Sequence, residues 1–238
     1  MPTEPGKPAR YGTGHLLMPQ PFATKLKGNP NAIFYESLGM QKRPQLAIAF
    51  AEAMEQFAVC EGSLGTLFLT LNSKKPDEAF IKLSENVTFS QRVAMVRKCA
   101  NGLDPSDKAL VWAVTDRAET AAGMRNKIAH CSWGYCDALP QAVLSLPTSR
   151  TNLDIRERLK QKIGLPSQRE ASEVGIMVYE ERDFTAVRMA GAYAMAPLDL
   201  LGDYLMNDST ARKILKSQIL SDPQTSQRYD KRVLNEYL

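Results

Sequence analysis

Two long stretches of the chain carry apolar residues at helical spacing. The first runs from Pro44 to about Leu71, and its apolar stripe consists of Leu46, Phe50, Met54, Phe57, Cys60, Leu64, Phe68 and Leu71. The second runs from Asp104 to about His130, and its apolar face consists of Leu110, Val111, Val114, Ala118, Ala121, Ile128 and Ala129. Side chains spaced three or four residues apart share one face of a helix. We therefore expect two long helices that pack through these faces.

Shorter periodic stretches predict the remaining helices. We expect a short helix from Pro76 to about Ser84 and another from Gln91 to Ala100, which Asn101 and Gly102 end. A last core helix is expected to start at Asp183 or Thr185 and to run to about Met206. Together with the two long helices, these elements are sufficient for an up-and-down helical bundle.

The connection before the last core helix loses its helical period. Ala142–Leu146 and Val174–Tyr179 read as short strands that pair as a β-ribbon, with an exposed helix from Leu153 to Ile163 between them. The expected fold is therefore mainly α, with a small β-ribbon insert at about 134–180. We divide the chain into an extended N-terminal arm (1–43), a helical domain (44–206) and a C-terminal helical and polar tail (207–238).

Each long helix carries one charge within its apolar stripe. Glu61 lies between Phe57 and Leu64 in the first helix, and Arg125 lies in the middle of the apolar face of the second. Because a buried charge is costly unless it is paired, we expect Glu61 and Arg125 to form an ion pair. Such a pair would orient the guanidinium of Arg125. It could equally serve only to fix the register of the two helices.

The end of the second long helix carries candidate chemistry. Arg125 and Asn126 precede His130, one of two histidines in the chain, and Asn126 and His130 lie one helical turn apart. A cation and a group that exchanges protons near neutral pH are what cleavage of an RNA phosphodiester requires. The order R-N-x-x-x-H resembles the signature of the HEPN superfamily, and the resemblance covers roughly Pro44 to Met206. The alternative is that His130 only caps the helix.

The HEPN resemblance implies a four- or five-helix bundle and, in many members, a metal-independent endoribonuclease. It implies that His130 acts as general acid or base, that Arg125 stabilises charge on the phosphoryl oxygens, and that Asn126 positions the phosphate or His130. The products would carry 2′,3′-cyclic phosphate ends. The family commonly forms homodimers and is frequent in toxin–antitoxin and antiphage systems, so an antitoxin or defence protein is an expected partner. Ser132 departs from one HEPN branch, which has a modifiable tyrosine there.

Other residues near the motif have supporting or ordinary interpretations. Glu119 lies two turns before Asn126 and would orient Asn126 or His130, or be a surface glutamate. Trp133 would stack on a base or pack in the core. His130, Cys131 and Cys136 lack a C-x-x-C pair and a second ligand pair, so we expect no zinc. No glycine-rich phosphate loop is present, and we expect no cofactor.

Composition narrows the class of protein. The net charge is +4, and basic residues outnumber acidic residues mainly in the terminal segments, so no dense basic patch predicts tight, non-specific RNA binding. No apolar run is long enough to span a membrane, the N-terminus lacks the apolar core of a signal peptide, and the four cysteines fit reduced thiols; we expect a cytoplasmic protein. The modest charge keeps a second class open, a non-catalytic helical dimerisation or sensor module. Exposure of His130 in a groove beside Arg125 would favour the ribonuclease.

Overall fold

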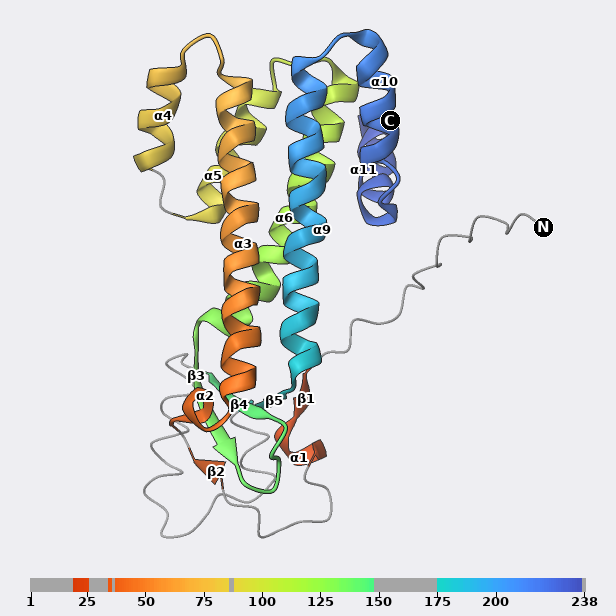
Figure 1. The fold of residues 1–238 in the computed structure, drawn as a ribbon. Helices are drawn as coiled ribbons and strands as arrows, with labels where there is room; N and C mark the ends of the chain where they lie inside the picture. Colours follow the sequence, from red (N-terminus) through yellow and green to blue (C-terminus); the bar gives the residue numbers. More distant parts are fainter. Residues whose placement is uncertain (1–18, 26–33, 36, 86–87, 148–174, 237–238) are drawn as a thin grey trace, which may run out of the picture.

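A bundle of long helices stands on a small sheet in the computed structural model (Figure 1). The structure describes residues 19–25, 34–35, 37–85, 88–147 and 175–236. The bundle consists of α3 (Pro44–Leu71), α5 (Phe89–Ala100), α6 (Pro105–Ala129) and α9 (Glu181–Met206), and α4 (Pro76–Glu85) projects beside α3. The predicted mainly helical fold is confirmed, and each of these helices lies close to its expected position.

Local sequence signals set where these helices begin. The N-cap of α5 is Thr88, whose hydroxyl accepts the N–H of Gln91 while the Gln91 side chain accepts the N–H of Thr88. This reciprocal capping starts α5 at Phe89, before the predicted Gln91. Asp104 caps α6 by accepting the N–H of Asp107, and a proline occupies the first turn.

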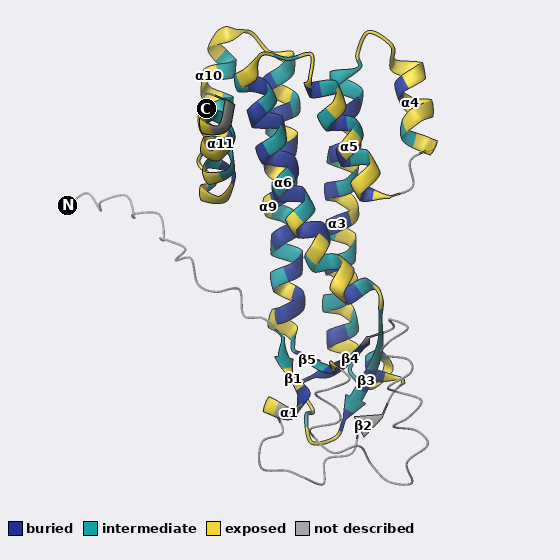
Figure 2. Cartoon of the chain, turned by 180° about the vertical axis from the view of Figure 1, so that it is seen from behind, coloured by how far each residue is buried: buried dark blue, intermediate teal, exposed yellow. Residues whose placement is uncertain are grey.

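The core lies between the helices, where the predicted apolar stripes meet. Figure 2 shows the buried positions along the inner sides of α3, α6 and α9, whereas α4 is largely exposed. The fully buried large side chains of this core include Leu64, Leu67, Leu110, Leu198 and Leu201. Burying a side chain of this size contributes about 1.5–3 kcal/mol relative to leaving it exposed, so this interface dominates the stability of the bundle.

The sheet has five strands in the order β1-β5-β4-β3-β2, with antiparallel pairing throughout. Its strands are β1 (Gln20–Pro21), β2 (Phe34–Tyr35), β3 (Cys131–Cys136), β4 (Val143–Pro147) and β5 (Met177–Tyr179). The predicted ribbon of β4 and β5 is confirmed, with Leu144 opposite Val178. The strand β3, which starts directly after His130 and pairs with β4, was not predicted. The predicted helix from Leu153 to Ile163 lies outside the described residues.

The N-terminal segment was wrongly predicted to be only an extended arm. Its described part supplies two strands and the short helices α1 (Phe22–Lys25) and α2 (Gly39–Lys42). Phe22 is 2% exposed and packs in the core of the sheet. Gly39 lies so close to β3 that an added Cβ would come within 2.3 Å of the Gly134 carbonyl oxygen. Apolar contact and close backbone approach therefore attach this segment to the sheet.

The C-terminal segment, expected to be a helical and polar tail, consists of α10 (Ser209–Ile219) and a further helix, α11 (Pro223–Glu236). The helix packs along α6 through polar contacts, including a hydrogen bond from Arg228 to Thr120. The strongly polar composition of α11 obscured its amphipathic pattern, although Tyr229 packs against the core of the bundle. No helix among the described residues is both long and apolar enough to span a bilayer.

Candidate functional site

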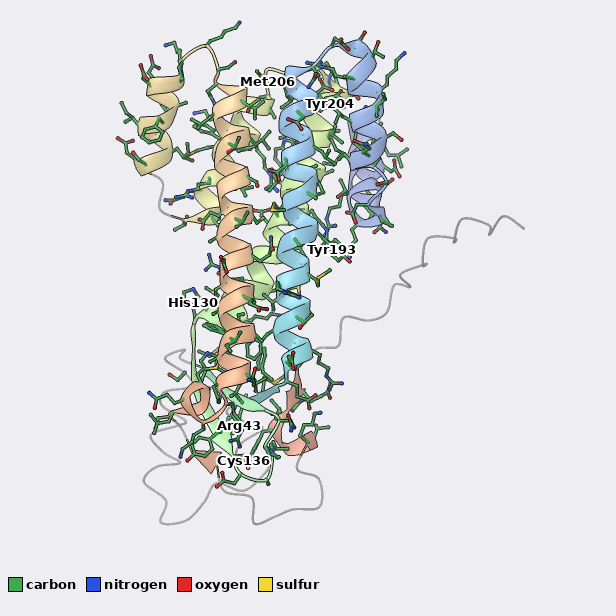
Figure 3. All side chains as sticks on the ribbon, in the orientation of Figure 1. Arg43, His130, Cys136, Tyr193, Tyr204 and Met206 are labelled. Atoms are coloured by element: carbon green, nitrogen blue, oxygen red, sulfur yellow. The ribbon has the colours of Figure 1, made fainter. Side chains whose placement is uncertain are left out.

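The motif residues lie where α6 ends and β3 begins. His130 is the C-cap of α6, with φ −110° and ψ 22°, and Cys131 already pairs with Pro147 of β4. The side chains of Asn126 and His130 are exposed. Figure 3 places His130 part-way along the molecule, between Arg43 and Cys136 at the sheet and Tyr204 and Met206 at the far end. The strand pairing therefore fixes the backbone immediately after His130.

Arg125 is held by a ring and an amide. Its guanidinium carbon lies 4.5 Å from the centre of the Phe57 ring, and its Nη1 donates to Asn126 Oδ1 over 3.0 Å. The Nε atom is buried and has no hydrogen-bond partner among the described residues. Cation–π contact and the amide thus orient Arg125 while leaving donor capacity on the guanidinium.

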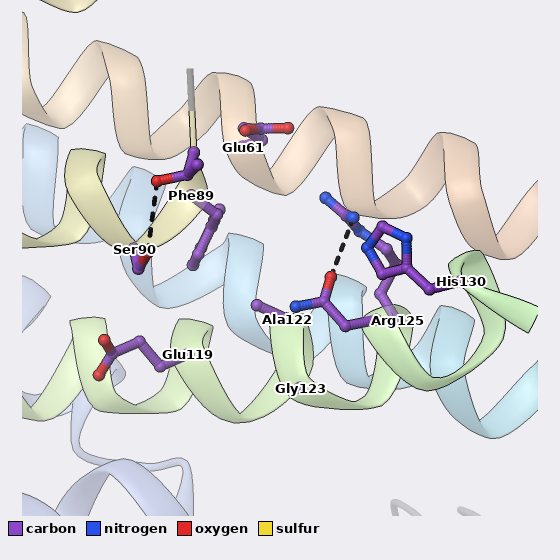
Figure 4. A pocket seen from close by; sticks show the side chains of 10 residues that line it. Glu61, Phe89, Ser90, Glu119, Ala122, Gly123, Arg125 and His130 are labelled. Atoms are coloured by element: carbon purple, nitrogen blue, oxygen red, sulfur yellow. Dashed lines mark hydrogen bonds between the residues drawn. The ribbon is translucent and has the colours of Figure 1, made fainter. Parts of the chain in front are cut away.

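These side chains line one pocket of about 590 Å³ (Figure 4). The pocket is open to solvent and lies between α3, α5 and α6. Its lining consists of Glu61, Thr88, Phe89, Ser90, Glu119, Ala122, Gly123, Arg125, Asn126 and His130. His130 and Arg125 lie at one end of the view, and Phe89 and Ser90 lie opposite on α5. The three motif residues predicted from the sequence are therefore brought together in a solvent-accessible cavity.

The N-terminus of α5 forms part of the pocket wall. Its capping box occupies the N–H groups of Thr88 and Gln91, whereas the amides of Phe89 and Ser90 belong to the first turn and have no acceptor within the helix. The positive end of the helix dipole favours negative charge at this place. Thr88, Phe89 and Ser90 were not predicted as pocket residues, although the Thr88-to-Gln91 spacing is a capping signal that could have located this helix N-terminus.

The predicted ion pair between Glu61 and Arg125 is wrong. Glu61 lies 3.3 Å from Arg92 Nη1, and the described residues show no ion pair between Glu61 and Arg125. The register of α5 brings Arg92 to Glu61, while Phe57 and Asn126 hold Arg125. Glu61 nevertheless lines the same pocket, with 23% of its side chain exposed.

Glu119 does not orient Asn126 or His130. Its Oε2 accepts a hydrogen bond from Arg97 Nη2 over 2.7 Å, and its side chain is 40% exposed at the pocket wall. The expectation that it supports the motif directly is therefore wrong, and its carboxylate is compensated by a cation from α5.

Trp133 belongs to an aromatic cluster rather than to the pocket. Its ring centre lies 5.9 Å from Phe50, 5.2 Å from Tyr179 and 5.5 Å from Phe184, with edge-on geometry in each case. The base-stacking interpretation has no support, because Trp133 packs against these rings and does not line the pocket. Trp133 therefore anchors β3.

The cysteines near the motif have structural roles. The Cys131 thiol donates to the Lys127 carbonyl over 2.9 Å, and burial raises its pKa. Burial also raises the pKa of Cys136, which packs in the core of the sheet. Within the described residues, no group of three or more histidine, cysteine or acidic side chains could hold a metal ion.

Comparison with known proteins adds no relative. No protein-family model matches the chain, and no curated protein or solved structure matches it.

Proposed function

We propose that this chain is a metal-independent endoribonuclease of HEPN type. The observation that carries the proposal is the single pocket that gathers Arg125, Asn126 and His130 opposite the N-terminus of α5. His130 is exposed there beside Arg125, which is the arrangement that the ribonuclease hypothesis requires. A guanidinium and first-turn amides are both groups that bind a phosphodiester.

The proposed reaction uses the ribose as its own nucleophile. The 2′-oxygen attacks the adjacent phosphorus, the bond from phosphorus to the 5′-oxygen breaks, and a 2′,3′-cyclic phosphate and a 5′-hydroxyl result. His130 takes the proton from the 2′-hydroxyl or gives one to the 5′-oxygen. Arg125 stabilises the negative charge on the phosphoryl oxygens, and Asn126 holds its guanidinium in place.

The acidic residues at the pocket do not prevent anion binding in this proposal. Glu61 and Glu119 each have an arginine partner on α5, Arg92 and Arg97 respectively. Their charges are therefore offset locally, while Arg125 has no carboxylate partner among the described residues.

A homodimer is part of the proposal, because one histidine in the pocket serves only one of the two proton transfers at a time. A second copy would supply a second Arg–His pair. Gly123 lines the pocket, and an added Cβ there would meet nothing within 4 Å, which leaves room for close approach of a second copy. We expect light scattering at micromolar concentration to give the mass of a dimer; a monomer that cleaves RNA would contradict this part. A role in toxin–antitoxin or antiphage defence, with a protein partner, rests on the motif resemblance alone.

The second candidate function is a non-catalytic dimerisation or sensor module. The contact between Arg125 and Phe57 favours it, because the arginine then contributes to packing regardless of any ligand. Under this alternative, replacing His130 would change little.

Total RNA incubated with the wild-type chain and with His130→Ala, in the presence of EDTA, tests the proposal. The matched control is Lys127→Ala, which removes an exposed basic side chain from the same turn of α6 but outside the pocket. We expect cleavage with 2′,3′-cyclic phosphate ends by the wild type and by Lys127→Ala, and none by His130→Ala. Equal cleavage by His130→Ala, or complete inhibition by EDTA, would overturn the proposal.

A further inference from the structure

A network of charged side chains connects the C-terminal helix to the pocket wall. Arg97 of α5 donates through Nη2 to Asp116 Oδ1 over 2.6 Å and to Glu119 Oε2 over 2.7 Å. Its Nε donates to the Thr115 hydroxyl over 3.0 Å. Arg97 therefore serves two carboxylates at once, and one of them, Glu119, lines the pocket.

Arg232 of α11 completes the network from the other side. It donates to the second oxygen of Asp116, through Nη2 over 2.8 Å and through Nε over 3.2 Å. Both guanidiniums also lie over the Trp112 ring, with Arg97 at 4.7 Å and Arg232 at 4.5 Å from its centre. Asp116 is thus shared between a cation of the bundle and a cation of the C-terminal helix.

Because Arg232 also pairs with Asp116, it determines how far the charge of Arg97 is available to compensate Glu119. With Arg232 in place, two cations compensate two carboxylates. Without it, Asp116 and Glu119 compete for Arg97 alone, and the pocket wall becomes more negative. The side chain of Arg97 is 16% exposed and that of Asp116 is 24% exposed, so water screens this competition less than it would at the open surface.

We infer that Arg97 and Arg232 are positioning residues for the pocket: by docking on Asp116, α11 keeps Glu119 compensated and so maintains the affinity of the pocket for a phosphodiester. Neither arginine lines the pocket, so both act through Glu119. The statement about affinity rests on the proposed function, whereas the coupling of Arg232 to Glu119 does not.

The contacts that attach α11 to α6 could allow the coupling between Arg232 and Glu119 to be changed by salt or by a partner. Asp222 at its start lies 3.6 Å from the buried Arg117, and Arg228 bonds Thr120. Among the residues of α11 with a described side chain, only Thr225 is fully buried. Tyr229 also packs against the core, but the contacts of Asp222 and Arg232 are ionic. These contacts are sensitive to salt and to a competing charged partner, and release of Arg232 would alter the pocket through Asp116.

The affinity test is a double-mutant cycle of Arg232→Gln and Glu119→Gln. Its readout is the Kd of a short single-stranded oligoribonucleotide of mixed sequence, measured by fluorescence anisotropy in a His130→Gln background that does not cleave. We expect Arg232→Gln to weaken binding about two- to five-fold when Glu119 is present and not at all in Glu119→Gln. Arg232→Lys should restore most of the affinity. In the cleaving enzyme, Arg232→Gln should raise KM and leave kcat within about two-fold.

Lys231→Gln is the matched control. Lys231 is exposed, precedes Arg232 and lies outside the network, so it removes the same charge from the same turn of α11. If Lys231→Gln weakens binding as much as Arg232→Gln, or if Arg232→Gln acts equally with and without the Glu119 charge, the effect is general electrostatics and the inference is overturned.

A second cycle, without RNA, separates this inference from the proposed function. Urea unfolding of the same variants should be non-additive: Glu119→Gln should lower the midpoint less in Arg232→Gln than in the wild type, because it then relieves repulsion with Asp116. Additive midpoints would overturn the coupling whatever the RNA results are. Failure of the wild type to bind RNA, with non-additive midpoints, would refute the proposed function and leave the coupling supported.

Discussion

The two environments at the junction of α6 and β3 differ sharply, although only two residues separate His130 from Trp133. Trp133 packs among Phe50, Tyr179 and Phe184, and burial raises the pKa of the Tyr179 hydroxyl. His130 is exposed at a pocket lined by charged and polar side chains. The aromatic cluster fixes the start of β3, and this fixes the position of His130 at the pocket. Stability and candidate chemistry thus occupy adjacent but separate sites, which substitutions should be able to separate.

The largest effect is expected from Trp133→Ala. Removing this partly buried ring opens space among three other rings and should lower the free energy of unfolding by about 2–4 kcal/mol. Trp133→Phe keeps an aromatic ring and should cost less. Urea denaturation measures both, and a loss below about 1 kcal/mol for Trp133→Ala would contradict the role of the cluster as the anchor of β3.

Replacement of Arg125 should affect activity strongly and stability little, the opposite of replacement of Trp133. Because Arg125 contacts Phe57 rather than a buried carboxylate, Arg125→Ala should lower the free energy of unfolding by only about 0.5–2 kcal/mol. It should reduce RNA cleavage about 10²–10³-fold, since it removes a donor to the phosphoryl oxygens. Chemical denaturation and initial cleavage rates give the two numbers. A stability loss of about 3–5 kcal/mol would instead indicate a buried ion pair.

Removal of the Asp107 charge should change stability and spare activity, because Asp107 lies near the start of α6, away from the pocket. Asp107 is 5% exposed, its carboxylate accepts the hydroxyl of Tyr204, and burial raises its pKa. An aspartate whose folded pKa is raised destabilises the folded state fully above the folded pKa, and this penalty shrinks as pH falls through the folded pKa and is gone below the unfolded pKa. Asp107→Asn should therefore gain stability relative to the wild type as pH rises from about 4 to about 7.

Asp104 provides the matched control for that pH dependence. Its pKa is lowered, chiefly because its carboxylate accepts the backbone N–H of Asp107. Its ionised form stabilises the folded state above the unfolded pKa, and this contribution is lost as pH falls through the folded pKa. Asp104→Asn should thus lose stability relative to the wild type as pH rises. Unfolding midpoints for both variants across the range test the two slopes, and slopes of the same sign would contradict the assignment.

The smallest effect is expected from Glu61→Gln. The Glu61 carboxylate pairs with Arg92 of α5. Partly exposed ion pairs of this kind contribute about 0.2–1 kcal/mol to the free energy of unfolding. The variant should lose no more stability than this and should bind a short oligoribonucleotide more tightly, because one negative charge leaves the pocket. Weaker binding would show that Glu61 supports Arg125 after all.

Helices with an apolar stripe and the ribbon of β4 and β5 were predictable from the sequence, whereas β3 and α11 were not. The stripes of α3 and α6 located both helices because burial of one face repeats at a fixed period. The strand β3 escaped because Cys131–Cys136 does not alternate regularly between buried and exposed positions. The helix α11 was not predicted because its composition is strongly polar, although Tyr229 packs against the core. Periodicity detects burial, whereas β3 depends on strand pairing and α11 partly on polar contacts such as that of Arg232 with Asp116.

The candidate site divides in the same way. Arg125, Asn126 and His130 share one helix end, so their proximity follows from helical geometry alone. The partners of Glu61 and Glu119 depend on where α5 packs and on which of its residues face α3 and α6. The spacing of apolar residues in α3 and α6 gives no information about either. Arg92 and Arg97 therefore replace the predicted partners.

The single-turnover rate of RNA cleavage by His130→Ala tests the central claim most directly. General acid–base catalysis contributes about 10²–10⁴-fold, so we expect the rate to fall by that factor, with the free energy of unfolding changed by no more than about 1 kcal/mol. Lys127→Ala, assayed beside it, should cleave like the wild type. A His130→Ala protein that is folded and cleaves RNA at the wild-type rate would contradict the account and leave the pocket to the non-catalytic module.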